Sequence, residues 1–338
     1  MFFFNKRQYV HAGFGILTIL CPFLFAILAH NNWFGVMGCF GSLIFMYYIP
    51  INQEHTMNHL LLAVGISTIS FPISAILSRI EWIGILWIAV LAFTVQYLMN
   101  ANNYIGPGVF FILMINGMIT SLHQLPIYHV LLLSIFSIFG TYVAFLLAAV
   151  ENRIYENNKL SITQIKIRNN SLNGNIKALI IGVFSLIAYF IGYSIHINNY
   201  YWILVSALTI LQSENITTAK KRQLEYIGAG LIGTLIAFVI YSYFDSITFL
   251  VILSMLFMGL ICLYMPKSYL IGNFFTTPIA LILFKIVRPD LGDTLIETRV
   301  LAIVIGTIIG LLGIWYYDSL NKKLKSFEIY NWDKNDLL

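Results

Sequence analysis

Residues 246–265 read SITFLVILSMLFMGLICLYM, a run of twenty residues that contains no charged side chain. An α-helix needs about 20 mostly apolar residues to cross the hydrocarbon core of a bilayer, because it rises about 1.5 Å per residue. Similar apolar runs recur along the whole chain, and they lack the period-two alternation of membrane β-strands. The sequence therefore predicts an all-α integral membrane protein.

The composition argues against a water-soluble globule. Of the 338 residues, 59% are hydrophobic and 10% are charged. A soluble domain carries about 25% charged residues, so this chain could not cover its apolar surface in water. This argues against a cytosolic enzyme, a secreted disulfide domain and a disordered protein. The net charge of +5 comes from basic residues in loops between apolar runs, which is typical of membrane topology rather than of nucleic-acid binding.

Twelve apolar runs are candidates for membrane helices. They cover roughly 9–29, 33–50, 57–79, 81–99, 104–121, 127–150, 175–195, 199–213, 224–244, 246–265, 269–287 and 297–317. With a cytoplasmic N-terminus, fifteen Lys and Arg residues fall on the cytoplasmic side and four fall outside: Arg79, Lys285, Arg288 and Arg299. This bias follows the positive-inside rule and predicts that both termini are cytoplasmic.

A long polar stretch separates two groups of six predicted helices. Landmarks recur in both groups: Trp33 and Trp202 lie 169 residues apart, and Pro107 and Pro278 lie 171 apart. Because each group has an even number of helices, both would start on the same side of the membrane as parallel repeats. The predicted units are residues 1–150 (first repeat), 151–174 (cytoplasmic linker), 175–317 (second repeat) and 318–338 (cytoplasmic tail).

No catalytic constellation or cofactor motif is recognisable. The three cysteines lie in apolar runs without metal-ligand spacing and are expected to be core residues. His55 and His59 lie four residues apart, but no third ligand accompanies them, so we predict no metal site. Glu151 and Glu225 fall at predicted helix boundaries, so no proton relay is predicted. We expect neither an enzyme nor a cofactor, a metal ion or a nucleic-acid partner.

The eighth predicted helix is shorter than a membrane crossing. Its apolar stretch YYWILVSALTILQ, at Tyr200–Gln212, has 13 residues. That length spans about 20 Å, against about 30 Å for the hydrocarbon core. Ser206, Thr209 and Gln212 recur every three residues and share one face. The face is either a helix–helix contact made by small polar residues or the lining of a substrate path.

The fifth and eleventh predicted helices carry helix-breaking residues. The fifth contains Gly106-Pro107-Gly108, and in the eleventh Asn273, Thr276 and Thr277 precede Pro278. A proline removes one backbone hydrogen bond and frees a carbonyl group. Helix interruptions at matching places in two repeats are typical of a substrate site in a transporter.

Arg299 and Trp202 each begin a helix that starts on the outside in this topology. They are either interfacial anchors or parts of an anion site. An arginine presents a rigid fork of donors that matches a carboxylate, and a tryptophan offers an aromatic face to a planar acid.

The stretch NNYYWILVSALTILQSENITTAKKRQLEYIGAGLIGTLIAF, at 198–238, resembles the fusaric acid resistance (FUSC) or aromatic acid exporter superfamily of bacterial membrane proteins. The resemblance includes Trp202 and Gln212 on the short helix, the basic loop after it and the glycine-rich helix that follows. Arg299, seven residues before a glycine, resembles the arginine of the family's closing helix. The resemblance covers about 175–315. One departure is Glu225, where the family usually has an arginine.

The resemblance implies a transporter that exports small organic, mainly aromatic carboxylic, acids across the plasma membrane, driven by an ion gradient. The predicted substrate pathway comprises Trp202, Ser206, Thr209, Gln212, Asn273, Thr276, Thr277 and Arg299. Two other interpretations stay open: a passive anion channel, and a non-transporting membrane scaffold or cell-envelope assembly factor. The expected partners are the lipid bilayer and a small organic anion, and the chain is compatible with a homo-oligomer.

Overall fold

The computed structural model describes residues 4–49, 56–104, 106–155, 171–289 and 292–335. Within these ranges it contains α-helices, one 3-10 helix and no strand, and every α-helix overlaps one of the predicted runs. The all-α prediction is therefore confirmed. The elements are α1 (Lys6–Leu28), α2 (Asn32–Ser42), the 3-10 helix η1 (Leu43–Tyr47), α3 (Thr56–Leu77), α4 (Glu81–Ala101), α5 (Phe110–Thr120), α6 (Ile127–Tyr155), α7 (Leu172–Ser194), α8 (Tyr201–Leu211), α9 (Ile216–Tyr243), α10 (Ile247–Tyr264), α11 (Tyr269–Val287) and α12 (Gly292–Asn335).

Helix length separates nine of these helices from the other three. Nine are long and apolar enough to cross a membrane. The helices α2, α5 and α8 have 11 residues each, so each spans about 17 Å. The prediction of twelve membrane-crossing helices is therefore not met by helix length: within the described ranges, nine helices are long enough.

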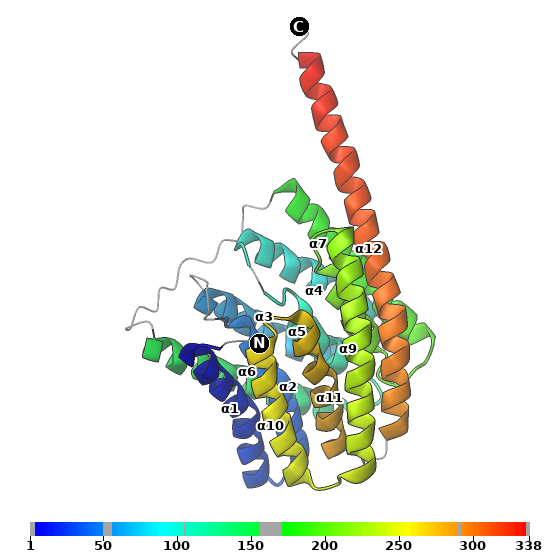
Figure 1. Ribbon diagram of the computed structural model, residues 1–338. Coiled ribbons are helices and arrows are strands. Elements are labelled where there is room, and N and C mark those ends of the chain that lie inside the picture. The colour runs from blue at the N-terminus through cyan, green and yellow to red at the C-terminus, as the bar shows by residue number, and fades with distance from the viewer. Residues whose placement is uncertain (1–3, 50–55, 105, 156–170, 290–291, 336–338) are drawn as a thin grey trace.

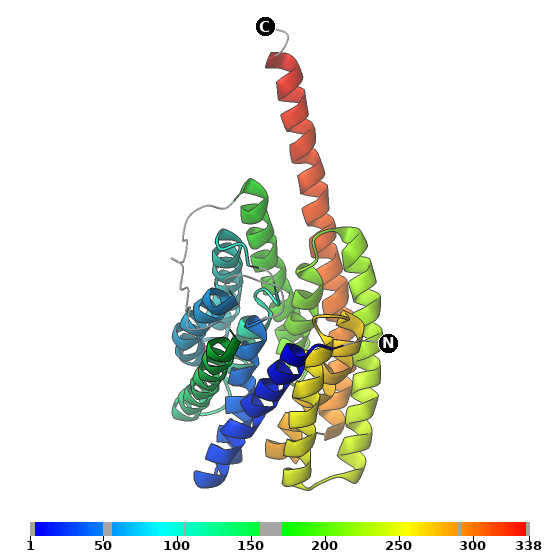
Figure 2. The ribbon, with the colours of Figure 1, turned by 60° about the vertical axis from the view of Figure 1, so that its left-hand side comes forward.

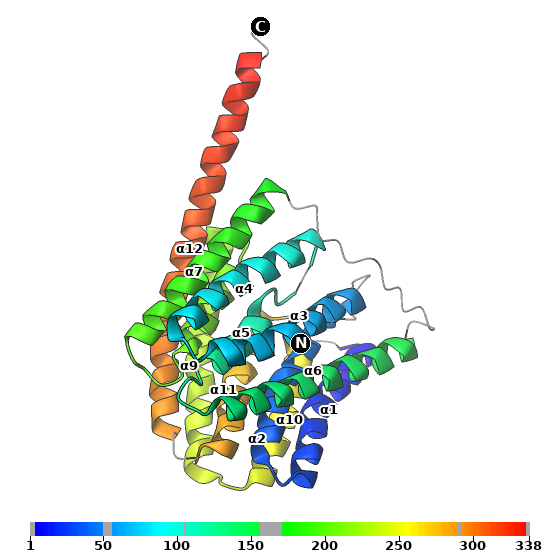
Figure 3. The same cartoon turned by 180° about the vertical axis from the view of Figure 1, so that it is seen from behind.

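The three short helices lie at the centre of the bundle. All 11 residues of α8 are buried, and so are 10 of the 11 residues of α5. A helix that is apolar on every side is covered either by protein or by lipid. For α5 and α8 the cover is protein. The longer helices supply it. Figure 2 shows α3, α4, α6 and α7 on one side and α9 to α12 on the other. Figure 3, which views the molecule from behind, shows the first group running obliquely across the side that faces the viewer.

Side-chain contacts show which helix ends lie together at each end of the bundle. At one end of the bundle the guanidinium of Arg7 lies 5.3 Å from the ring centre of Tyr155, so α1 starts beside the end of α6. At the opposite end, Arg79 donates a hydrogen bond of 2.6 Å to the carbonyl of Leu125, which joins the end of α3 to the segment before α6. Which end faces the cytoplasm stays a prediction.

The same pattern of helix pairs occurs in both halves of the chain. In the first half, α1, α2 and α6 pack against one another, and α3 packs against α5 and α6. In the second half, α7, α8 and α12 pack against one another, and α9 packs against α11 and α12. The remaining two helices cross over, because α4 packs against α7 and α10 packs against α1. The two halves are therefore tied together by one helix from each.

Two predicted boundaries differ from the structure. The helices include both ends of the predicted linker 151–174, because α6 continues to Tyr155 and α7 begins at Leu172; residues 156–170 lie outside the described residues. The helix α12 was expected to end near residue 317 but continues to Asn335. No glycine or proline occurs between residues 314 and 335 to end it. As a result α12 projects beyond the other helices (Figure 1).

Glycines bring helix backbones into direct contact. A Cβ atom at Gly41 of α2 would collide with the carbonyl of Ser137 on α6, and one at Gly140 would collide with the carbonyl of Gly38. In the second half, the backbone of α12 approaches α8 in the same way at Gly306. Small residues permit this close packing between membrane helices.

Replacing Gly140 by Ala should therefore destabilise the protein. The added methyl group forces α2 and α6 apart, and overpacking of this kind costs about 1–3 kcal/mol. We expect a lower Tm for the purified protein in thermal unfolding. Gly65→Ala on α3 is the matched control, because nothing lies within 4 Å of its Cβ position. Equal Tm values for the two variants would contradict the close packing.

Candidate functional site

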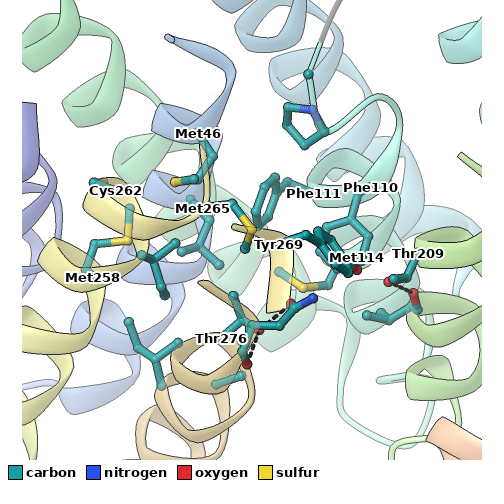
Figure 4. Close-up of a pocket in the computed structure, with 18 of the residues that line it drawn as sticks. Met46, Phe110, Phe111, Met114, Thr209, Met258, Cys262, Met265, Tyr269 and Thr276 are labelled. Atoms are coloured by element: carbon teal, nitrogen blue, oxygen red, sulfur yellow. Dashed lines mark hydrogen bonds between the residues drawn. The ribbon is translucent and has the colours of Figure 1, made fainter. Parts of the chain in front are cut away.

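A cavity of about 400 Å³ lies among the short helices. This volume is typical of small-molecule sites, which range over about 300–1,000 Å³. Its walls come from α1, α2, η1, α5 and α8 to α12. Methionine side chains, which adapt to differently shaped partners, and phenylalanines make much of the lining. Figure 4 shows Met46, Phe110, Phe111, Met114, Met258 and Met265.

Each short helical segment has one end at the cavity. Gln212 follows the end of α8, Tyr48 follows the end of η1, and Gly106 and Pro107 precede the start of α5; all four residues line the cavity. The turn before α5 depends on Gly108, whose φ of +55° lies in the left-handed region that glycine adopts without a steric penalty. The polar groups of these helix ends are therefore brought close to the cavity.

Arg299 is a cavity-lining cation that is almost completely buried, with 3% of its surface exposed. Its Cζ atom lies 4.4 Å from the ring centre of Trp202. Its Nη2 atom donates hydrogen bonds to the hydroxyls of Tyr226, at 3.0 Å, and Thr277, at 3.2 Å. The Tyr226 hydroxyl lies 3.2 Å from Oγ of Ser206. This network holds one nitrogen of the guanidinium in place.

The rest of the Arg299 guanidinium has no partner within the described residues. Its Nε and Nη1 atoms are buried without a hydrogen bond, and no described carboxylate forms a salt bridge with it. A buried charge without a counter-charge is costly. The cavity therefore has a charge that a bound anion would neutralise.

Other buried groups at the cavity wall also lack partners, and all of them are hydrogen-bond donors. They are Nε1 of Trp202, Nε2 of Gln212 and Nδ2 of Asn273, while the side-chain oxygen of Asn273 accepts a bond of 2.9 Å from Thr276. No aspartate or glutamate is found among the described lining residues. Unsatisfied donors without acceptors are complementary to a ligand that carries only acceptors at its polar end.

A second guanidinium, that of Arg222, also lines the cavity. Its Cζ atom lies 4.6 Å from the ring centre of Tyr269, and it precedes Tyr226 by one turn of α9. Glu225, the departure from the FUSC pattern, contacts Lys221 at 3.9 Å and does not line the cavity. The departure therefore adds no negative charge to the site.

The structure brings the predicted pathway residues together. Six of the eight line the cavity: Trp202, Thr209, Gln212, Asn273, Thr276 and Arg299. Ser206 and Thr277 lie behind the wall, in the hydrogen-bond network of Arg299. The polar face of α8 thus contributes both to the lining and to helix–helix contacts. Its role in transport stays a prediction.

Five polar lining residues were missed by sequence reasoning: His11, Tyr48, Arg222, Tyr226 and Tyr269. A signal existed for Arg222 and Tyr226, because they lie four residues apart on one helix face beside the predicted short helix. Glu151, predicted at a helix boundary, lies on α6 four residues before that helix ends. It is fully buried, and its carboxylate contacts His11.

The fold and the cavity define a multi-pass α-helical membrane protein with a positively charged internal cavity. Residues 187–313, less than half of the chain, match the family model described as Fusaric acid resistance protein-like, so this part of the chain is similar to FUSC proteins. The match and the long apolar helices together point to a membrane transport protein. The match contains every predicted pathway residue and leaves α1 to α6 outside. No curated protein and no solved structure matches the chain.

Replacing Arg299 by Met should give a protein at least as thermally stable as the wild type, because it removes a buried charge that has no described counter-charge. The same change should abolish stabilisation by a bound carboxylate. Benzoate at 100 times its Kd should stabilise the wild type by about 2.7 kcal/mol. Thermal unfolding with and without benzoate measures both effects.

The control is Arg79→Met, which changes an arginine that bonds to the carbonyls of Leu122 and Leu125 away from the cavity. It should keep the rise in Tm with benzoate. If the Arg299 variant kept that rise as well, the anion site would have to lie elsewhere.

Proposed function

We propose that the chain is a transporter that exports small organic acids, aromatic carboxylates foremost, across the plasma membrane. The observation that carries the proposal is the unpaired, buried guanidinium of Arg299, stacked on Trp202 in an otherwise largely apolar cavity. Arginine stays charged at every physiological pH, and its donors suit a carboxylate. The apolar and aromatic walls suit the ring of the same ligand.

Some N–H groups of Arg299 bond to the protein, and the others are available to a ligand. A guanidinium has five N–H groups. Those of Nη2 are used for Tyr226 and Thr277, and those of Nε and Nη1 remain for a ligand. The free amide nitrogens of Gln212 and Asn273 add neutral donors at the same cavity. A carboxylate, which only accepts hydrogen bonds, would satisfy these groups without leaving a donor of its own unpaired.

The mechanism we propose is alternating access. The two halves act as parallel six-helix repeats with both termini in the cytoplasm, and the cavity between them opens to one side at a time. A membrane potential that is negative inside favours the exit of an anion by about 2.3 kcal/mol per charge per 100 mV. An ion gradient supplies any further driving force.

Arg299→Lys should lose most transport of a carboxylate while the protein still accumulates in the membrane. A lysine ammonium keeps the charge, but it is a single point with three donors. It cannot hold Tyr226 and Thr277 and also reach into the cavity as the planar guanidinium does. Efflux of radiolabelled benzoate from loaded proteoliposomes measures the loss.

The matched control is Arg79→Lys, which should transport at the wild-type rate because Arg79 does not line the cavity. Near wild-type efflux by Arg299→Lys would leave Arg299 only a structural role, as the hydrogen-bond partner of Tyr226 and Thr277, and would overturn the anion site. A steady benzoate current without a coupling ion would favour the passive channel. An absence of flux through the wild type would favour the scaffold.

The proposed orientation predicts opposite labelling at the two ends of α7. Ser171, the N-cap, and Asn198, beyond the C-terminal end, are both exposed. In a cysteine-free background, Ser171→Cys should react with a membrane-impermeant maleimide only after cells are permeabilised, and Asn198→Cys should react in intact cells. The reverse result would invert the topology and, with it, the direction assigned to the positive-inside bias.

A further inference from the structure

A buried pair of ionisable side chains, His11 on α1 and Glu151 on α6, lies against the cavity. Nδ1 of His11 lies 3.0 Å and 3.2 Å from the two carboxylate oxygens of Glu151. The histidine is 4% exposed and the glutamate is fully buried. His11 lines the cavity and Glu151 lies behind it. The pair belongs to the first half of the chain, outside the FUSC match.

The surroundings of the pair leave one ring nitrogen of His11 without a hydrogen-bond partner within the described residues. The His11 ring stacks on Phe45, with ring centres 4.9 Å apart, and lies 6.0 Å from the ring centre of Tyr48. Cys262 of α10 also lines the cavity, and Arg7 lies one turn earlier on α1. Nδ1 is used by Glu151, and within the described residues Nε2 of His11 has no hydrogen-bond partner.

Histidine is the side chain whose ordinary pKa lies between pH 5 and 8. With the Nδ1 proton donated to Glu151, a further proton adds at Nε2 and gives an imidazolium that stays paired with the carboxylate. The pair then changes from a net charge of −1 to zero. The other ionisable groups that line the cavity are arginine, tyrosine and cysteine side chains, types whose ordinary pKa values exceed about 8. They are Tyr48, Arg222, Tyr226, Cys262, Tyr269 and Arg299.

We infer that the His11–Glu151 pair is a proton-binding site linked to the anion site of the same cavity. Loss of one negative charge at the wall strengthens the attraction between the cavity and an anion. Linkage is reciprocal, so a bound anion also strengthens proton binding. Anion affinity therefore rises as the pH falls, and anion binding takes up protons. The inference rests on the proposed function, since it requires that the cavity bind an anion.

The test uses the purified full chain and benzenesulfonate, an aromatic anion that stays ionised throughout the pH range. We expect the wild type to bind it about five- to tenfold more tightly at pH 5.5 than at pH 8, which is within the usual range of coupling between two sites. Calorimetry in two buffers of different ionisation enthalpy should show proton uptake on binding at pH 6.5.

The variant that removes the titration is His11→Gln combined with Glu151→Gln, which keeps a side-chain hydrogen bond but no ionisable group. Its affinity should be the same at both pH values. The matched control is His129→Gln, an exposed histidine on α6, which should keep the wild-type pH dependence.

Each outcome decides a separate question. If the wild type binds benzenesulfonate at neither pH, the anion site and the proposed function fail together. If it binds equally at both, or if the double variant keeps the pH dependence, the proton site is overturned and the anion site stands. If the double variant does not fold, the wild-type calorimetry decides, and binding without proton uptake overturns the inference.

Discussion

In hydrocarbon, a helix that is too short to reach water at both ends leaves backbone N–H and C=O groups that only protein can satisfy. This constraint governs α2, α5 and α8, which have 11 residues each. It explains why α8 is buried along its whole length and why the longer helices enclose the centre. It also explains where the cavity lies. The short segments stop inside the protein, and the residues that flank their ends form its walls: Tyr48, Gly106, Pro107 and Gln212.

The charge of the cavity follows from what the helices around this centre contribute. Two guanidiniums line it, from α9 and α12, and the described lining contains no carboxylate. Glu151 lies behind the wall and reaches the cavity only through His11. An aromatic ring stacks on each guanidinium, Tyr269 on Arg222 and Trp202 on Arg299. Cation–π contacts stabilise a desolvated cation without neutralising its charge, so the cavity keeps a net attraction for anions.

Much of the helical framework could be predicted because every α-helix overlaps an apolar run. The lengths of α2 and α5 could not, since the runs at 33–50 and 104–121 are longer than the 11-residue helices within them. The short eighth helix and its association with Arg299 were also accessible, since both depend on one local stretch and one charge. The pairing of His11 with Glu151 could not be predicted, because the two residues lie 140 positions apart in the sequence. The pattern of one helix does not indicate which other helix packs against it. The same reason hid the contribution of η1. The extension of α12 to Asn335 was missed because the prediction ended with the apolar run, whereas a helix continues through polar residues until a breaker stops it.

The family match lies in one half of the chain, whereas residues of both halves line the cavity. The match covers only the second half, which supplies both guanidiniums and the unpaired donors of Trp202, Gln212 and Asn273. The first half supplies apolar lining such as Met46, Phe110 and Met114, together with the ionisable His11. On the proposed function, the groups that hold the acid group of the ligand would lie in one half, and most of the apolar contacts with its body in the other. Since α4 and α10 cross over to the opposite halves, a change in the spacing of the halves would alter both sets of contacts together. A ligand that bridges the two halves can therefore bias their relative position only through its differential contacts with each arrangement.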